Sequence, residues 1–89
     1  MPEISRFYGI IIYMYINDHN PPHFHAKYNE FQATFSIDDF ALLNGKLPSK
    51  ALSLVIEWAS IHQIELKENW YKLSESNQSV FNKIVMHDK

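Results

Sequence analysis

The sequence has no cysteine among its 89 residues. Without cysteine, the chain can form neither a disulfide scaffold nor a thiolate metal site. It also has no excess of basic side chains, because 8 Lys and Arg stand against 10 Asp and Glu, and the two signs are mixed along the chain. This balance argues against binding to duplex DNA, for which a basic patch is typical.

Long apolar segments are also missing. Apolar runs such as residues 9–16 fall far short of the roughly 20 residues that a membrane-spanning helix needs. The opening residues, MPEISRF, lack the cationic start and the apolar core of a signal peptide. We therefore expect a cytoplasmic protein with no membrane contact, folded as a single domain over residues 1–89.

Aromatic residues are abundant. They make up 15% of the chain, within an apolar total of 46%. This composition is too apolar for a disordered chain and is sufficient for a hydrophobic core. Small domains bury a smaller share of their surface than large ones. The sequence therefore raises the question of whether so short a chain can cover all its aromatic side chains alone.

Hydrophobic patterning predicts four strands in the first half of the chain. Residues 7–16 are β-branched and aromatic on both strand faces, which is typical of a strand covered on both sides. Residues 24–28 and 31–37 predict two further strands, and residues 40–43 a short fourth one before the turn signal Asn44-Gly45.

The second and third of these strands predict a hairpin closed by Asn29-Glu30. Its register puts apolar residues on one face and polar residues on the other, and a slip by one residue would mix the two sets. The expected partners are Tyr28 with Phe31, Ala26 with Ala33 and Phe24 with Phe35 on the apolar face, and Lys27 with Gln32, His25 with Thr34 and His23 with Ser36 on the other.

The second half of the chain predicts one long helix from Ser49 to about residue 74. Its apolar stripe consists of Leu52, Val55, Ala59, Leu66, Trp70 and Leu73, with His62 filling a gap and Trp58 and Ile61 at the edge. So long a helix is expected to bend or break in this small domain. The order β-β-β-β-α predicts an α+β fold, an antiparallel sheet of about four strands packed on one long C-terminal helix.

One helix covers only one face of a sheet, so the other face is expected to lack a cover within the chain. It would combine aromatic and polar side chains: Phe7, Ile11, Tyr13, Tyr15, His23, His25, Lys27 and Thr34. Such a surface predicts an incomplete core and a partner that completes it.

Three histidines fall within the motif DHNPPHFH, which makes this segment the candidate for chemistry. His23 and His25 point to one strand face, and Pro21-Pro22 restrict the loop before them. With Asp18 or His19 as a third ligand, they can hold a divalent metal. Alternatively, His19, His23 and His25 can act as general acid and base in phosphodiester cleavage. The remaining candidate binding residues are Arg6, Tyr13, Tyr15, Asp18 and Lys27.

Structural explanations of the same residues stay open. Asp18 and His19 can cap the loop through hydrogen bonds to the backbone, while His23 and His25 line a surface against a partner. Tyr13 and Tyr15 can stack on the bases of single-stranded RNA, although the acidic balance of the chain disfavours nucleic acid.

The segments MPEISRFYGIIIYMYINDHNPPHFHAKYNE, GKLPSKALSLVIEW and ELKENW resemble the bacterial DUF4160 family, a domain of unknown function. The resemblance covers about residues 1–73, whereas the end NKIVMHDK departs from the Lys-Ile-Pro-Leu-like end of many members. The matching positions are Asp18, His19, Pro21, Pro22, His23, His25, Trp58 and Trp70. Such proteins are often encoded beside a small DUF2442 protein, which implies a toxin–antitoxin-type pair.

Two hypotheses of function follow. In the first, the chain is the toxin-like component of a two-protein module and works through protein–protein interaction on its open sheet face. Its partner would be an antitoxin-like protein, of DUF2442 type by the resemblance, or a second copy of the chain. In the second, it is a small ribonuclease or other hydrolase, with or without a divalent metal, that uses His19, His23 and His25. The two are compatible, since a toxin can be an enzyme.

Overall fold

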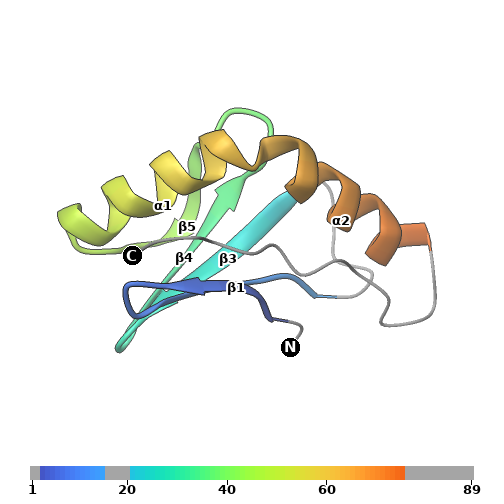
Figure 1. Cartoon of the computed structure of the whole chain (residues 1–89). Coiled ribbons are helices and arrows are strands. Elements are labelled where there is room, and N and C mark those ends of the chain that lie inside the picture. Colours follow the sequence, from blue (N-terminus) through green and yellow to red (C-terminus); the bar gives the residue numbers. More distant parts are fainter. Residues whose placement is uncertain (1–2, 16–20, 76–89) are drawn as a thin grey trace.

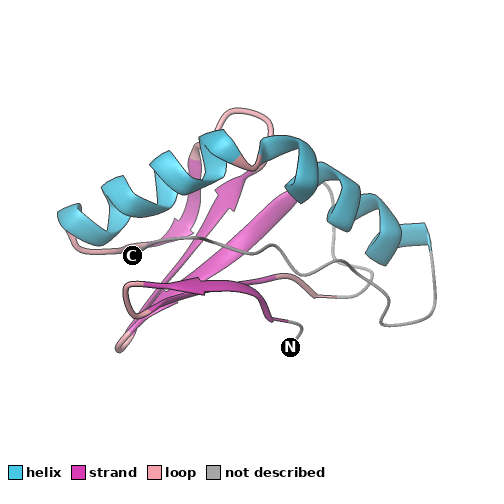
Figure 2. Cartoon of the chain, viewed as in Figure 1, coloured by secondary structure: helices cyan, strands magenta, loops and turns pink. Residues whose placement is uncertain are grey.

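The computed structural model describes residues 3–15 and 21–75. The fold is α+β, as predicted, but its sheet has five strands and is followed by two helices (Figure 1). The elements are β1 (Glu3–Phe7), β2 (Ile10–Tyr13), β3 (His23–Tyr28), β4 (Phe31–Ser36), β5 (Leu42–Gly45), α1 (Ser49–Ile61) and α2 (Gln63–Glu75). The sheet is antiparallel, with the strands in chain order from β1 to β5. Both helices lie on the same side of it (Figure 2).

The single strand expected over residues 7–16 is wrong, because β1 and β2 form a hairpin there. Tyr8 and Gly9 make the turn with φ values of 50° and 79°. Positive φ at both central residues is the geometry of the tight turn that suits twisted antiparallel strands. Phe7 then pairs with Ile10 and joins the core, so our placement of Phe7 on the open face was also wrong.

The hairpin between β3 and β4 is confirmed with its register. His23 pairs with Ser36, and the following pairs continue to Tyr28 and Phe31 as expected. The turn contains Asn29 with a φ of 54°, a conformation that asparagine adopts more readily than most residues.

The last strand starts later than expected. Strand β5 begins at Leu42, and Asn44 and Gly45 belong to it rather than to a turn. The chain instead turns at Asp38 to Phe40, where Phe40 has a φ of 61°. The Ala41 N–H donates to the Asp39 carboxylate at 3.1 Å, and this bond, with the Ser36 hydroxyl, holds the pKa of Asp39 below its ordinary value.

The long helix breaks, as its length predicted. Helix α1 begins at Ser49 and ends at Ile61, and α2 resumes at Gln63. At the break, the His62 N–H donates to the Trp58 carbonyl at 3.1 Å, and the His62 ring contacts the Glu65 carboxylate, with 2.6 Å between Nδ1 and Oε1. The expected helix is therefore two 13-residue helices that meet at His62.

The core lies between the sheet and the two helices. Trp58 is at its centre rather than at its edge, since it is only 1% exposed, whereas Ile61 is 65% exposed. The core consists of Ile4, Phe7, Ile10, Ile12, Met14, Phe24, Ala26, Ala33, Phe35, Ile37, Ala51, Val55, Trp58, Ala59, Leu66 and Trp70. Helices and sheet thus share one continuous hydrophobic layer.

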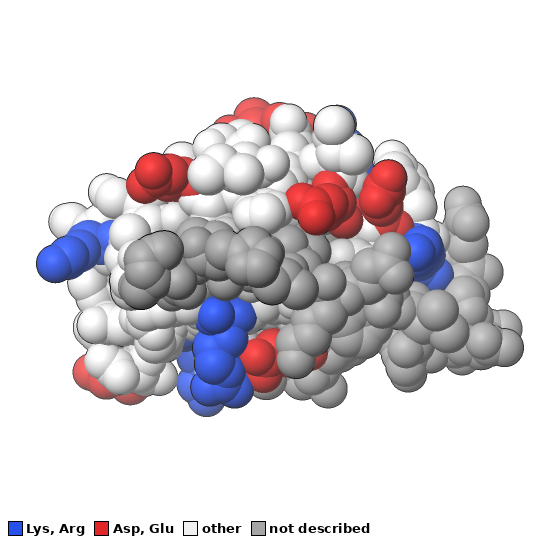
Figure 3. Space-filling model, viewed as in Figure 1, with Lys and Arg blue, Asp and Glu red and all other residues white. Residues whose placement is uncertain are grey.

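On the face shown in Figure 3, the described residues form no large field of one charge. Figure 3 shows acidic and basic side chains scattered over one face, with uncharged surface between them. Among the described residues, neither helix is long and apolar enough to cross a lipid bilayer.

Candidate functional site

The sheet face opposite the helices carries the candidate site. Two rows of paired residues cross it, and directly opposed residues of antiparallel strands point to the same face. The first row is Glu3, Tyr13, His25, Thr34 and Asn44, and the second is Arg6, Ile11, Lys27 and Gln32. Together with Tyr15 and His23 we call these residues the histidine face. Both helices pack on the other side of the sheet, and α2 contacts this face through Trp70, whose ring meets His23 at the start of β3.

A cluster of aromatic rings forms the middle of the histidine face. Tyr13 stacks on His25 with ring centroids 5.0 Å apart and an angle of 14° between the planes. Tyr15 meets both rings edge-on, at 5.6 Å from Tyr13 and 5.0 Å from His25. Tyr13 is only 3% exposed, whereas Tyr15 is 43% exposed. The cluster therefore exposes the ring of Tyr15, which packs on the rings of Tyr13 and His25.

The two histidines of β3 are held by neighbouring groups. The His23 Nδ1 lies 2.7 Å from the Pro21 carbonyl oxygen, which can only accept, so Nδ1 carries a proton. The His25 Nδ1 lies 3.1 Å from the Thr34 hydroxyl. The rings are 5.1 Å apart, and His23 also contacts Trp70 of α2 at 5.0 Å. The imidazoles are thus oriented by the loop, by β4 and by α2.

A shallow polar pocket of about 140 Å³ adjoins His25. It is lined by Tyr13, His25, Gln32, Ala33, Thr34, Asn44 and Gly45. Hydroxyl, amide and imidazole groups thus meet at one hollow of the sheet face. Such an arrangement can bind a polar group of a ligand or of a protein partner by hydrogen bonds.

The structure brings together four of the predicted site residues, namely Tyr13, Tyr15, His23 and His25. Lys27 follows in the neighbouring row. Arg6 lies in that same row on β1, where its guanidinium binds the Glu3 carboxylate at 2.9 and 3.1 Å, an interaction that raises the pKa of Arg6.

Two predicted residues, Asp18 and His19, lie outside the described residues. Within residues 3–15 and 21–75, no three His, Asp or Glu side chains are grouped closely enough to hold a metal ion. The metal hypothesis therefore depends on Asp18 or His19 as the third ligand, and both lie outside the described residues.

Sequence reasoning placed Thr34 on the open sheet face but missed three other contributors to the site. Gln32 had a signal, because the predicted hairpin register already placed it opposite Lys27. Asn44 had been assigned to a turn, and nothing in the sequence pointed to the contact between Trp70 and His23.

Burial of Tyr13, with a smaller contribution from Tyr15, raises the pKa of its phenol. The folded protein thus favours the neutral phenol, so this contribution to stability is complete below the unfolded pKa of about 10 and is lost as pH rises through the folded pKa. We expect Tyr13→Phe to lose less unfolding free energy than wild type on the alkaline side, as measured by urea denaturation at a series of pH values. The matched control is Tyr8→Phe, because Tyr8 is 55% exposed. An alkaline loss in Tyr13→Phe as large as in wild type would contradict the assignment.

A family model described as "Domain of unknown function (DUF4160)" matches residues 9–71. The match spans β2 to most of α2 and so contains Tyr13, Tyr15, His23, His25 and Trp70. No curated protein and no solved structure matches the chain.

Proposed function

The chain belongs to the DUF4160 family, and from its histidine face we propose that it is the toxin-like component of a two-protein, toxin–antitoxin-type module. It acts in the cytoplasm through protein–protein interaction on this face. The observation that carries the proposal is the ring cluster of Tyr13, Tyr15 and His25 on the sheet side opposite both helices.

The composition of the histidine face supports a protein partner. Tyrosine and tryptophan are enriched among the residues that dominate binding energy at interfaces, and such anchors lie among polar groups that exclude water. Tyr15 fits the anchor, since it is accessible and its ring is held by Tyr13 and His25. Lys27, Gln32 and Thr34 supply polar groups on the same face of the sheet.

The partner we propose is a small antitoxin-like protein of DUF2442 type, which silences the chain by covering the histidine face. A second copy of the chain could also cover this face, so the test must distinguish a homodimer from a complex with the DUF2442-type partner. Only a partner that hides Tyr15 satisfies the proposal, because binding elsewhere would leave the ring cluster accessible.

We expect Tyr15→Ala to weaken binding of a DUF2442-type partner from the same genome by about 2 kcal/mol, or roughly 30-fold, because an anchor ring is lost. Stability should change little, since the ring is partly exposed. Titration calorimetry with the purified pair gives the affinity, and growth arrest on expression of the chain alone, relieved by the partner, gives the toxin assignment.

Tyr71→Ala is the matched control, because Tyr71 is also exposed but lies on α2. Equal weakening of partner binding by both substitutions would show that the interface does not lie on the histidine face. A chain that is a soluble monomer, binds no such partner and leaves growth unchanged would contradict the whole proposal. If the chain forms a homodimer and Tyr15→Ala dissociates it, the partner on the histidine face is a second copy of the chain.

Catalysis by the histidines is the second candidate function, because His23 and His25 lie with their rings 5.1 Å apart and the proton on one of them is positioned by Pro21. Two imidazoles at this separation can serve as acid and base in cleavage of an RNA phosphodiester. In a version of this proposal that uses a divalent metal, Asp18 is the third ligand, and His19 is a further catalytic candidate.

We expect His23→Ala and His25→Ala each to lower RNA cleavage by about 100-fold or more, the usual share of general acid–base catalysis. Cleavage of total RNA by purified protein is the measurement, and His62→Gln at the helix break is the control. Equal cleavage by all variants would exclude these imidazoles from the reaction. Elemental analysis that finds no stoichiometric metal in active protein would exclude the metal version.

A further inference from the structure

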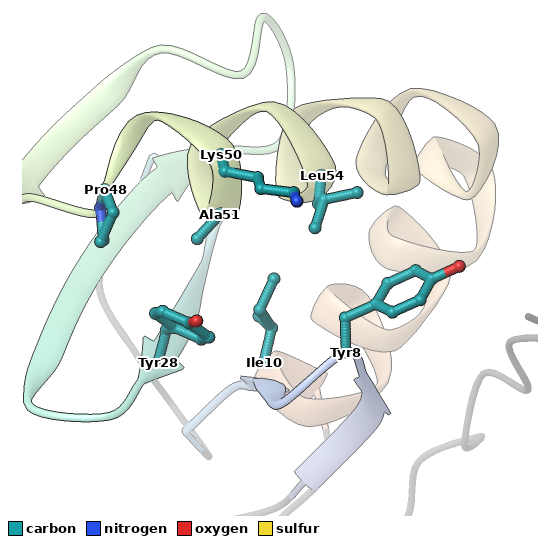
Figure 4. Close-up of a pocket in the computed structure, with 7 residues that line it drawn as sticks. All are labelled: Tyr8, Ile10, Tyr28, Pro48, Lys50, Ala51 and Leu54. Carbon is teal, nitrogen blue, oxygen red and sulfur yellow. The ribbon is translucent and has the colours of Figure 1, made fainter.

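A second hollow lies on the opposite side of the sheet from the histidine face. It is open to the surface, has a volume of about 420 Å³ and is bordered by β2, β3, the first hairpin turn and the first half of α1. Its lining consists of Tyr8, Ile10, Tyr28, Pro48, Lys50, Ala51 and Leu54. Figure 4 shows the α1 residues on one side of this pocket and Ile10, Tyr28 and Tyr8 on the other.

The walls of this pocket are mainly apolar. Ile10 and Ala51 belong to the core and form the base, and Leu54 and the ring of Tyr28 pack partly against that core. The Tyr8 ring stands beside the opening with its hydroxyl directed away from the pocket (Figure 4). The shape and the apolar lining suit an apolar ligand, and the volume falls in the range of about 300–1,000 Å³ that is common for small-molecule sites.

Positive charge marks one wall of the pocket. Among the described residues that line it, Lys50 alone is charged, and its side chain runs along the rim toward Leu54 (Figure 4). Within the described part of the chain, no salt bridge involves Lys50. The pocket is also built on the first turn of α1, where there is no acidic residue and Pro48 provides no side-chain cap. Helix N-termini of this kind favour negative charge.

We propose that this pocket binds a small apolar carboxylate, such as a medium-chain fatty acid anion, with its hydrocarbon part against Ile10, Ala51 and Leu54 and its carboxylate beside Lys50. The ammonium group of Lys50 at the rim distinguishes this ligand from a neutral apolar molecule. The proposal is independent of the histidine face, because the two hollows share no residue.

Titration of ¹⁵N-labelled full-length protein with decanoate, below its micelle concentration, tests the proposal. We expect saturable shifts of the backbone amide signals of Tyr8, Ile10, Tyr28 and Ala51. Decanol, which lacks the charge, should bind roughly threefold to tenfold more weakly. Lys50→Met should remove that difference while keeping the hydrocarbon stem, Lys50→Arg should restore it, and Lys72→Met on α2 should leave it unchanged.

The outcomes separate clearly. Saturable shifts at the lining residues with the expected order of variants support the proposal. Equal binding of decanoate and decanol, or decanoate binding that Lys50→Met does not weaken, overturns the carboxylate assignment. Shifts confined to the histidine face, or no saturable shifts, overturn the site. Lys50 is exposed, so these variants are expected to fold.

Discussion

Replacing Trp58 with alanine should lower the free energy of unfolding by about 3–5 kcal/mol, the usual cost of removing a large aromatic side chain from a core. Trp58 stacks on Phe7 at 5.4 Å and meets Phe24 edge-on at 6.2 Å. It therefore joins α1 to β1 and β3. Urea denaturation followed by far-ultraviolet circular dichroism measures the change without depending on the lost indole signal.

Trp58→Phe is the informative companion. The Trp58 Nε1 is buried and has no hydrogen-bond partner among the described residues, so the wild-type protein already bears the cost of an unsatisfied donor. Phenylalanine keeps the ring contacts and removes that donor, so its cost should be well below that of alanine. A loss in Trp58→Phe as large as in Trp58→Ala would show that the indole makes a hydrogen bond that the structure does not reveal.

The second large effect is expected at Gly45, where alanine should destabilise the protein by more than about 2 kcal/mol. Gly45 has a φ of 75°, and an added Cβ would lie 2.1 Å from the Gln32 carbonyl oxygen. That oxygen is part of the β4 backbone, so it cannot move aside without breaking the pairing of β4 and β5. Chemical denaturation gives the stability change, and amide hydrogen exchange of β5 shows whether that strand detaches first.

Gly9→Ala provides a matched control for this clash. Gly9 has a nearly equal φ of 79°, but an added Cβ would only touch the Tyr28 ring at 3.6 Å. It should therefore suffer only the left-handed strain, about 1–2 kcal/mol. The difference between the two variants isolates the steric clash at Gly45, and equal losses would show that backbone strain alone explains both.

The sequence predicted the central hairpin better than the strands on either side of it. Residues 24–28 and 31–36 each alternate strictly between apolar and polar side chains, so only one register keeps the two faces separate. Residues 7–16 have no such alternation, because apolar residues continue through the turn at Tyr8 and Gly9. Without a polar turn residue, the hairpin was indistinguishable from one long strand. Because residues 7–16 were treated as one strand, Phe7 was assigned to the wrong face of the sheet.

The candidate site was predictable where it depended on strand periodicity. The alternation of β3 placed His23 and His25 on one face, and the hairpin register added Thr34. The contact of His23 with Trp70 was not predictable, because it depends on where the break at His62 directs α2. The central position of Trp58 was missed for a related reason, since the sheet, rather than the helix pattern, determines which part of a broad apolar stripe becomes buried.

The order of the strands has a consequence for how the chain folds. Each strand pairs with its neighbour along the chain, so every step of sheet formation closes a short loop at a small entropic cost. Helix α1 follows all five strands, yet its Trp58 stacks on Phe7 in the first of them. During synthesis, the sheet can therefore assemble while its core face still lacks the helices. We therefore expect nascent chains to expose a broad apolar surface until α1 leaves the ribosome, and the risk of aggregation to be greatest in that period.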